Sequence, residues 1–177
     1  RGKTLVQKLT EEGNQWIIYS LLNSFLPSPF IDHAGRMLVD IALAAEDASL
    51  LECLFEKQPS LIDSPHLNAR TLVQMAIEGS KCRLLELSLE KEPGLLRSEG
   101  GNLARTAIKK RKLDILLFLL EKEPTLVHSV DDEGQSLAHV AMCEGQSDTL
   151  VQLLEKEPDL LYQVDNKGET LIDAAVL

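Results

Sequence analysis

Aromatic residues are scarce in this 177-residue sequence, at 4% of the chain, although 44% of the residues are hydrophobic. Leu, Ala and Ile must therefore build most of the core, and such side chains suit thin helical layers that pack closely. No apolar run approaches the length of about 18 residues that a membrane-spanning helix needs. The longest run is Ile115–Leu120. The sequence therefore predicts a helical protein without a transmembrane segment.

The chain also lacks an excess of positive charge, because its net charge is −10 and its pI is about 4.9. Nucleic-acid binding depends on the neutralisation of phosphates by basic residues, so this balance argues against a nucleic-acid partner. The three cysteines form no C-x-x-C pair, and their odd number fits neither a disulfide framework nor a zinc motif. Reduced thiols in a cytoplasmic protein are the expected state.

Motifs of catalysis are missing as well. The sequence contains no G-x-x-x-x-G-K-[ST], G-x-G-x-x-G or G-x-S-x-G motif. His139 and Cys143 stand four residues apart on a predicted helix, but a Cys–His nucleophile pair also needs a third group to orient the base. We therefore expect no catalytic residue, no cofactor and no bound metal in this chain.

What the sequence does contain is one six-residue stretch written four times. LLEKEP occurs at Leu119–Pro124 and Leu153–Pro158, with the related forms SLEKEP at Ser88–Pro93 and LFEKQP at Leu54–Pro59. The four prolines are separated by 34, 31 and 34 residues. A fixed period of this length is typical of stacked-repeat architectures.

Superposing the copies gives units that begin near residues 2, 35, 69, 100, 134 and 168. Each unit predicts a short first helix such as Ser136–Cys143, a turn such as Glu144–Asp148, and a second helix such as Thr149–Lys156 with an apolar stripe. The EKEP ending is interpreted as a helix stop, because Lys suits the last turn and Pro cannot continue the helix. The stretch is repeated because the fold is repeated.

The third unit is three residues shorter than the others between its proline and the first helix of the next unit. Pro93 lies 7 residues before Gly100, whereas Pro124 lies 10 residues before Gly134. We therefore expect the loop that leads into Gly100 to be reduced or distorted, and Gly100–Asn102 (GGN) is a turn signal on its own.

These units resemble the ankyrin repeat, whose pattern is D-x-x-G-x-T-P-L-H-x-A-A followed by a turn with Gly and a leucine-rich helix. The best matches are DDEGQSLAHVAMCEG, from Asp131 to Gly145, and DNKGETLIDAA, from Asp165 to Ala175. Leu replaces the Pro of the motif in every unit, and His is kept only at His139. The resemblance implies an all-α solenoid of stacked helix-turn-helix pairs, with about five units and a partial sixth. It implies one domain over residues 1–177, expected to be a fragment of a longer protein.

One basic stretch interrupts the acidic chain. Arg105–Lys112 (RTAIKKRK) holds five basic residues and no acid. Aligned with the other units, Lys109 and Lys110 end the first helix, while Arg111 and Lys112 form the turn. The stretch is interpreted either as a solvated turn or as a docking site for an acidic segment of a partner protein.

The resemblance further implies a protein-binding module without enzymatic activity, which would contact its partner through the concave helix ends and the finger loops. The candidate binding residues are Arg70, Lys109, Lys110, Arg111, Asp132, Glu133, Gln135, Glu144, Asn166 and Lys167.

Two alternatives stay open at this point. The chain could be the substrate-recruiting or regulatory arm of an enzyme, in contact with a catalytic domain outside these residues, or a scaffold that associates with itself. The EKEP-x-L ending is similar to diverged bacterial ankyrin repeats, including effectors that intracellular pathogens deliver into host cells. This similarity implies a cytoplasmic location, in the producing cell or in a host cell.

Overall fold

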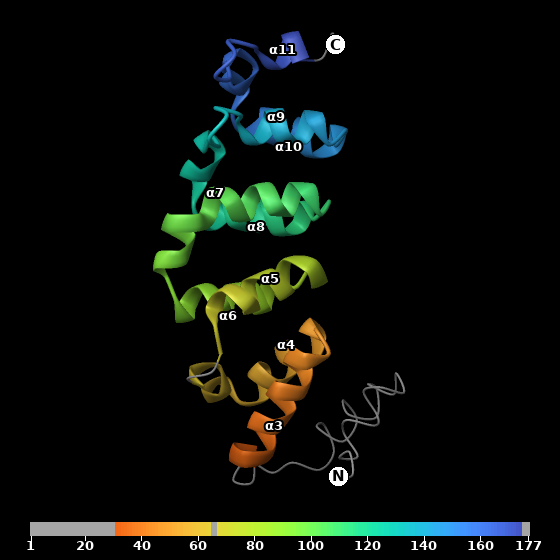
Figure 1. Ribbon diagram of the computed structural model, residues 1–177, viewed down its shortest axis with the longest axis vertical. Helices are drawn as coiled ribbons and strands as arrows, with labels where there is room; N and C mark the ends of the chain where they lie inside the picture. Colours follow the sequence, from red (N-terminus) through yellow and green to blue (C-terminus); the bar gives the residue numbers. More distant parts are fainter. Residues whose placement is uncertain (1–30, 65–66, 175–177) are drawn as a thin grey trace. The chain divides into compact units, whose positions relative to one another are not determined.

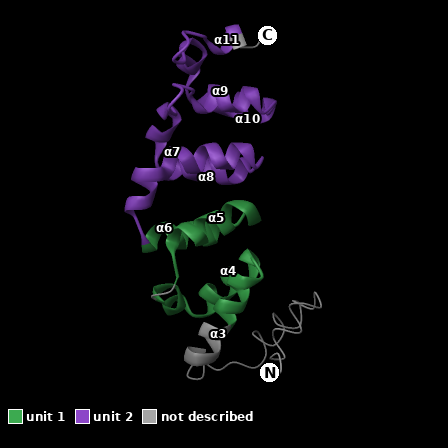
Figure 2. Ribbon diagram, viewed as in Figure 1, with its two compact units in different colours: residues 1–91 green, residues 92–177 purple. Residues whose placement is uncertain are grey.

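The computed structural model describes residues 31–64 and 67–174. Apart from isolated bridges, all regular secondary structure in this part of the chain is helical (Figure 1). The all-α prediction is confirmed. The start of the first predicted unit, near residue 2, and the last three residues lie outside the described part. The chain divides into two compact units, Arg1–Lys91 and Glu92–Leu177, which Figure 2 colours separately.

In the first unit, helices are paired and joined by short connections. α3 packs against α4, α4 packs against α5, and α5 packs against α6. Side chains such as Leu51, Phe55 and Leu85 are almost completely buried between them. The elements are α3 (Ile31–Ala44), α4 (Ala48–Lys57), the 3₁₀ helix η2 (Pro59–Asp63), α5 (Ala69–Gly79) and α6 (Cys82–Lys91).

The second unit repeats this arrangement. α7 pairs with α8, α9 pairs with α10, and α9 also packs against α7 and α11. Ile115, Leu116 and Leu119, which belong to the longest apolar run of the sequence, are at most 1% exposed. The elements are α7 (Gly94–Lys109), α8 (Leu113–Lys122), η3 (Pro124–His128), α9 (Leu137–Cys143), α10 (Ser147–Lys156), η4 (Pro158–Tyr162) and α11 (Leu171–Ala174).

The EKEP stretches end helices, as predicted, but the prolines also begin the next element. In three copies the α-helix ends at the Lys and a 3₁₀ helix starts at the Pro. Proline suits the first position of a helix because its fixed φ is already helical and no hydrogen bond needs its missing N–H. Two residues later a leucine returns to the core: Leu61, Leu126 and Leu160 are 3%, 8% and 1% exposed. The repeated stretch therefore both closes a helix pair and anchors the link to the next one.

The turns inside the helix pairs share one geometry. The residues at positive φ are Glu46, Ser80, Arg111 and Gly145, of which only the last is glycine. In each turn the next N–H bonds to a carbonyl five residues back, as in Lys112 N–H to Ala107 O at 2.8 Å. This arrangement satisfies carbonyls that the end of a helix would otherwise leave without partners.

The short third unit differs from the expected loop. No loop forms, because α7 runs without interruption from Gly94 to Lys109 and includes Gly100–Asn102. The turn signal read in GGN is therefore wrong. Gly100 is required for packing: a Cβ at this position would lie 2.7 Å from Leu126 Cδ2. Because the connection is three residues shorter, about two extra turns of helix stand in place of a loop.

Candidate functional site

Two loops of the second unit project as fingers before α9 and α11. We call them the 131 finger (Val130–Ser136) and the 165 finger (Val164–Thr170). Each is closed at its base by an isolated antiparallel bridge between its first and last residues. Gly134 and Gly168 lie at φ 77 and 79, where glycine avoids the cost that a Cβ would bring.

One aspartate organises each finger. Asp131 Oδ1 accepts the N–H groups of Glu133 and Gln135 at 3.0 and 2.8 Å, and Asp165 Oδ1 accepts those of the corresponding residues Lys167 and Glu169 at 2.8 and 3.0 Å. The backbone hydrogen bond from Glu169 is the main reason why the pKa of Asp165 lies below its ordinary value. The ionised form of the Asp165 carboxylate is therefore the form that the 165 finger stabilises.

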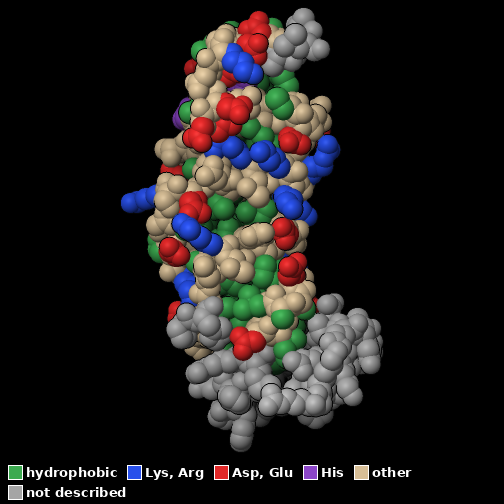
Figure 3. Space-filling view, viewed as in Figure 1, with side chains coloured by type: hydrophobic (Ala, Val, Ile, Leu, Met, Phe, Trp, Pro, Cys, Tyr) green, Lys and Arg blue, Asp and Glu red, His purple; other side chains and the backbone are tan. Residues whose placement is uncertain are grey.

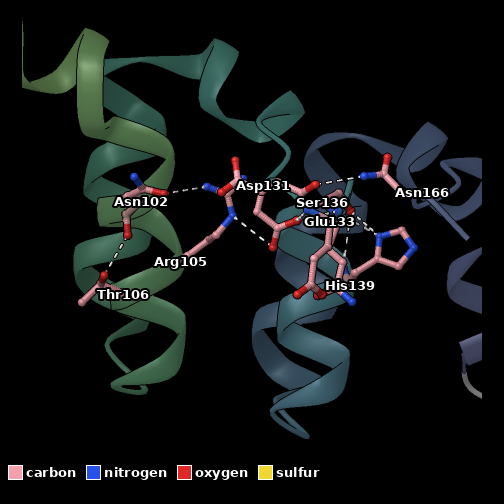
Figure 4. A network of polar contacts seen from close by, with 10 residues as sticks. Asn102, Arg105, Thr106, Asp131, Glu133, Ser136, His139 and Asn166 are labelled. Atoms are coloured by element: carbon pink, nitrogen blue, oxygen red, sulfur yellow. Dashed lines mark hydrogen bonds and ion pairs between the residues drawn. The ribbon is translucent and has the colours of Figure 1, made fainter.

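The fingers are bonded to each other. Asn166 N–H donates to Glu133 O at 3.0 Å, and Asn166 Nδ2 donates to Asp132 O at 2.9 Å (Figure 4). Both bonds run from the 165 finger to the finger that precedes it. The tips are consequently held in place, although Asp132, Glu133, Asn166 and Lys167 are exposed.

Behind each finger a helix is capped by a reciprocal pair. Ser136 Oγ lies 2.8 Å from His139 Nδ1 and accepts the His139 N–H, while the Ser136 N–H bonds to the ring. Asp173 closes the same arrangement with Thr170 at the start of α11. The motif position that holds histidine in one unit and aspartate in the next therefore serves as a helix cap in both.

On the α7 side of the 131 finger lies a buried arginine, at the position of α7 that corresponds to His139. Arg105 is 8% exposed, with its Nε 4.0 Å from Asp131 Oδ2 and its Nη1 3.3 Å from Asn102 Oδ1 (Figure 4). Within the described part of the chain, Nε and Nη2 make no hydrogen bond. Burying a guanidinium group with so few partners costs free energy, and the nearby carboxylate of Asp131 offsets part of this cost.

The predicted basic turn lies at the far end of α7. Lys109 ends the helix, and Lys109, Lys110 and Arg111 are exposed. Arg111 Nη2 donates to Glu144 O at 3.1 Å, so the basic turn contacts the turn of the next helix pair. Gln146 Nε2 also donates to Ile108 O across these turns. On the face drawn in Figure 3, basic and acidic side chains of the second unit are interspersed.

The structure brings most of the predicted site residues together in two groups. Lys109, Lys110, Arg111 and Glu144 form the group at the turns, and the group at the fingers comprises Asp132, Glu133, Gln135, Asn166 and Lys167. Arg70 belongs to the first unit, where it is exposed in the first turn of α5 with its N–H bonded to Asn68 Oδ1.

Sequence reasoning missed the residues that hold the fingers, which are Arg105, Asp131 and Asp165. The D-x-x-G spacing was an available signal for the two aspartates. For Arg105 the available signal was a charge at the position that aligns with His139.

Within residues 31–64 and 67–174, no group of three or more His, Cys, Asp or Glu side chains is arranged to hold a metal ion. In the same ranges, no helix is both long and apolar enough to cross a membrane. Comparison with known proteins gives no assignment, since the chain matches no protein-family model and no curated protein.

Proposed function

We propose that this chain is an ankyrin-repeat solenoid whose function is to bind a partner protein through its fingers and the turns of its helix pairs. It acts as a recognition module rather than as an enzyme. The proposal extends the all-α architecture to a specific repeat family, on the basis of the 34-residue period and the finger, capping and turn geometry that successive units share.

One observation carries the proposal: equivalent positions have the same backbone geometry but different exposed side chains. Asp132 and Glu133 correspond to Asn166 and Lys167, on two fingers with the same turn and the same internal hydrogen bonds. A rigid backbone with different tip chemistry limits the entropy lost on binding and leaves the surface free to select a partner. The exposed tip side chains take no part in the core, so packing does not dictate their chemistry.

The basic turn adds a charge preference. Three exposed cations, Lys109, Lys110 and Arg111, stand together in a chain whose net charge is −10. Such a local reversal of charge attracts an acidic segment and speeds the encounter with it. Arg111 occupies a position at φ 58, which glycine fills in the next turn. Glu46 and Ser80 occupy the corresponding positions of the first unit at similar φ, so the same turn presents a different side chain in each helix pair.

The test is affinity capture from a eukaryotic cell lysate, read by mass spectrometry, with the triple variant Lys109→Glu, Lys110→Glu, Arg111→Glu. We expect the unchanged chain to retain a partner that the variant loses. The matched control is Lys57→Glu, Arg97→Glu, Lys156→Glu, which makes the same charge change at exposed positions elsewhere and should retain the partner.

Both variants should remain folded, because exposed substitutions usually change the free energy of unfolding by less than about 0.5 kcal/mol. Equal loss of the partner in both would show that general charge, and not the basic turn, governs binding. Capture of no protein under any condition would argue against a recognition module.

A further inference from the structure

In the first unit, one lysine ties the second helix of a pair to the pair before it. Lys91, the last residue of α6, donates from Nζ to Ile62 O and, at 3.4 Å, to Ser64 O. Both carbonyl groups belong to the end of the 3₁₀ helix η2 and its cap. α6 also packs against α4 and η2. The ammonium group of Lys91 therefore fills the place between α6 and η2.

The second unit has the same parts in the same order but lacks this contact. Lys156 of α10 is the counterpart of Lys91, and it follows Val127 by the 29 residues that separate Lys91 from Ile62. The residues that flank η2 and η3 have nearly the same backbone angles, so Val127 O takes the place that Ile62 O has in the first unit. Lys156, however, is exposed and forms no hydrogen bond or ion pair with the described residues.

A groove of about 710 Å³ lies at this place, between α8 and η3 on one side and α10 on the other. Its apolar lining includes Leu117, Leu120 and Val127. Leu120 and Val127 are only 3% and 6% exposed, so they form the base of the groove. Ligand sites in proteins typically have volumes of about 300–1,000 Å³. The groove therefore has room for more than one side chain.

The polar residues of the groove favour a cation. Glu121 and Glu157 contribute two carboxylates, and Glu157 Oε2 lies 3.6 Å from His128 Nε2. Among the lining residues only Lys156 is a permanent cation, and it is exposed. An ammonium group has three donors and no acceptor, and its hydrogen bonds to carboxylates are strong. A carbonyl group and a carboxylate at the same apolar groove suit such a group.

We propose that this groove is a docking site for a lysine of a partner protein, carried next to an apolar residue in an exposed segment. The ammonium group of that lysine donates to Val127 O and pairs with Glu157. Its methylene groups and the apolar neighbour cover Leu117 and Leu120. The occupant is chosen on two observations: a lysine fills the equivalent place in the first unit, and carboxylates outnumber cations in the groove. This inference rests on the proposed function and adds a contact opposite in charge to the basic turn.

The probe is the capped peptide acetyl-Ala-Leu-Lys-Leu-Ala-amide. The control peptide carries Nε-acetyl-lysine in place of lysine, which keeps the methylene groups and removes the charge. A third compound, n-butylamine, supplies the ammonium group without a peptide. Each is titrated at neutral pH into the full ¹⁵N-labelled chain, and the backbone amide resonances report where and how tightly it binds.

We expect the lysine peptide to shift the amides of Val127, His128 and Glu157 in a saturable way. The acetyl-lysine peptide should bind at least about tenfold more weakly, the factor that one lost charged hydrogen bond represents. Glu157→Gln keeps the volume and removes the charge, so it should weaken the lysine peptide about fivefold and leave the acetyl-lysine peptide unchanged. The control variant Glu92→Gln makes the same change at the corresponding, exposed position of another EKEP stretch and should bind normally.

Equal binding of the two peptides, binding of n-butylamine as tight as that of the lysine peptide, or binding unchanged by Glu157→Gln would overturn the proposal. Lys156→Ala tests the nearest competitor. An affinity at least about tenfold higher in this variant would assign the groove to Lys156 itself, whereas an unchanged affinity supports an occupant from outside the chain. A partner captured from lysate that the basic-turn variant loses and Glu157→Gln retains would exclude the groove and leave the recognition module intact.

Discussion

Two stretches of the second unit follow the same EKEP ending and then diverge. After Pro124 the chain makes a 3₁₀ helix, the 131 finger and the short helix α9, whereas after Pro93 it makes only the long helix α7. The first steps are the same in both, since Leu95 N–H bonds to Glu92 O at 3.0 Å and Leu126 N–H to Glu123 O at 3.1 Å. The length of the connection then decides the outcome.

This difference shows that the finger is an optional part of the repeat. Seven residues are too few to return from the buried leucine, form a turn and re-enter a helix, so the stretch from Gly94 to Gly100 continues as helix instead. The helix saves its own backbone hydrogen bonds but gives up the exposed tip. The unit without a finger thus keeps its buried leucine in the core but has no exposed tip.

The largest change we expect would come from restoring the finger. Replacing Gly94–Gly100 with the ten-residue segment Thr125–Gly134 should shorten α7 by about nine residues, so that it starts near Leu103, as α9 starts at Leu137. The new finger should accept the Asp132 N–H and slow its hydrogen exchange. Circular dichroism would report the lost helix, and exchange measured by NMR would report the bond. Unchanged helicity with a rapidly exchanging Asp132 amide would show that more than loop length separates the two stretches.

The next largest effect concerns the buried leucines that the two stretches share. Leu95→Ala should lower the free energy of unfolding by about 3 kcal/mol, because Leu95 is 2% exposed and its removal leaves a cavity. Leu126→Ala should cost about as much, and urea unfolding of both would compare them. A cost near zero for Leu95 would mean that the long helix does not use this leucine as its anchor.

A smaller effect should separate two glycines of α7. Gly100→Val should destabilise the chain by about 1–3 kcal/mol, since the added atoms meet the Leu126 side chain. Gly94→Ala should be neutral or stabilising by up to about 1 kcal/mol, because no atom lies within 4 Å of its added Cβ and alanine favours the helix. Thermal unfolding of the two variants is the measurement. Equal effects at both positions would contradict the close contact between α7 and η3.

The smallest expected effect is the pH dependence of the 165 finger. The pKa of Asp165 is lowered in the folded chain, chiefly by the backbone N–H of Glu169. Its contribution to stability is therefore present above the ordinary value of about 4, and is lost as the pH falls through that value toward the lowered one. Asp165→Asn should flatten this part of the stability profile, measured by urea unfolding between neutral and acid pH, whereas the exposed Asp159→Asn should not. Equal slopes in the three proteins would refute the role of this carboxylate.

The sequence was informative wherever a residue's role repeats. Ala76, Ala107 and Ala141 each lie seven residues after the start of their units at 69, 100 and 134, and all three are 0% exposed. The helix stops at the EKEP stretches and the all-α class follow from the same period. Repetition makes these positions readable because each copy meets nearly the same surroundings.

The structure could not be predicted from the sequence at positions that depend on contacts with another repeat. The pair Gly100–Gly101 signals a turn by itself, yet it lies inside α7 because the connection is too short and because Gly100 packs under Leu126. Arg105 occupies the motif position of the histidine. Its pairing with Asp131 could not be predicted, because it depends on the absence of a finger before α7. The pairing of Arg105 with Asp131 accompanies this departure from the period, which periodicity alone does not show.

The hydrogen bonds of Asn166 give the pair of fingers a direction. Donors point toward the start of the chain and carbonyl groups toward its end, so the two sides of a finger are chemically unlike. A further finger on the α7 side would have to turn its carbonyl groups toward the N–H groups of the 131 finger. In the opposite orientation, N–H groups would face N–H groups. The backbone alone, before any side chain is compared, would therefore allow a further finger to join this pair in one orientation only.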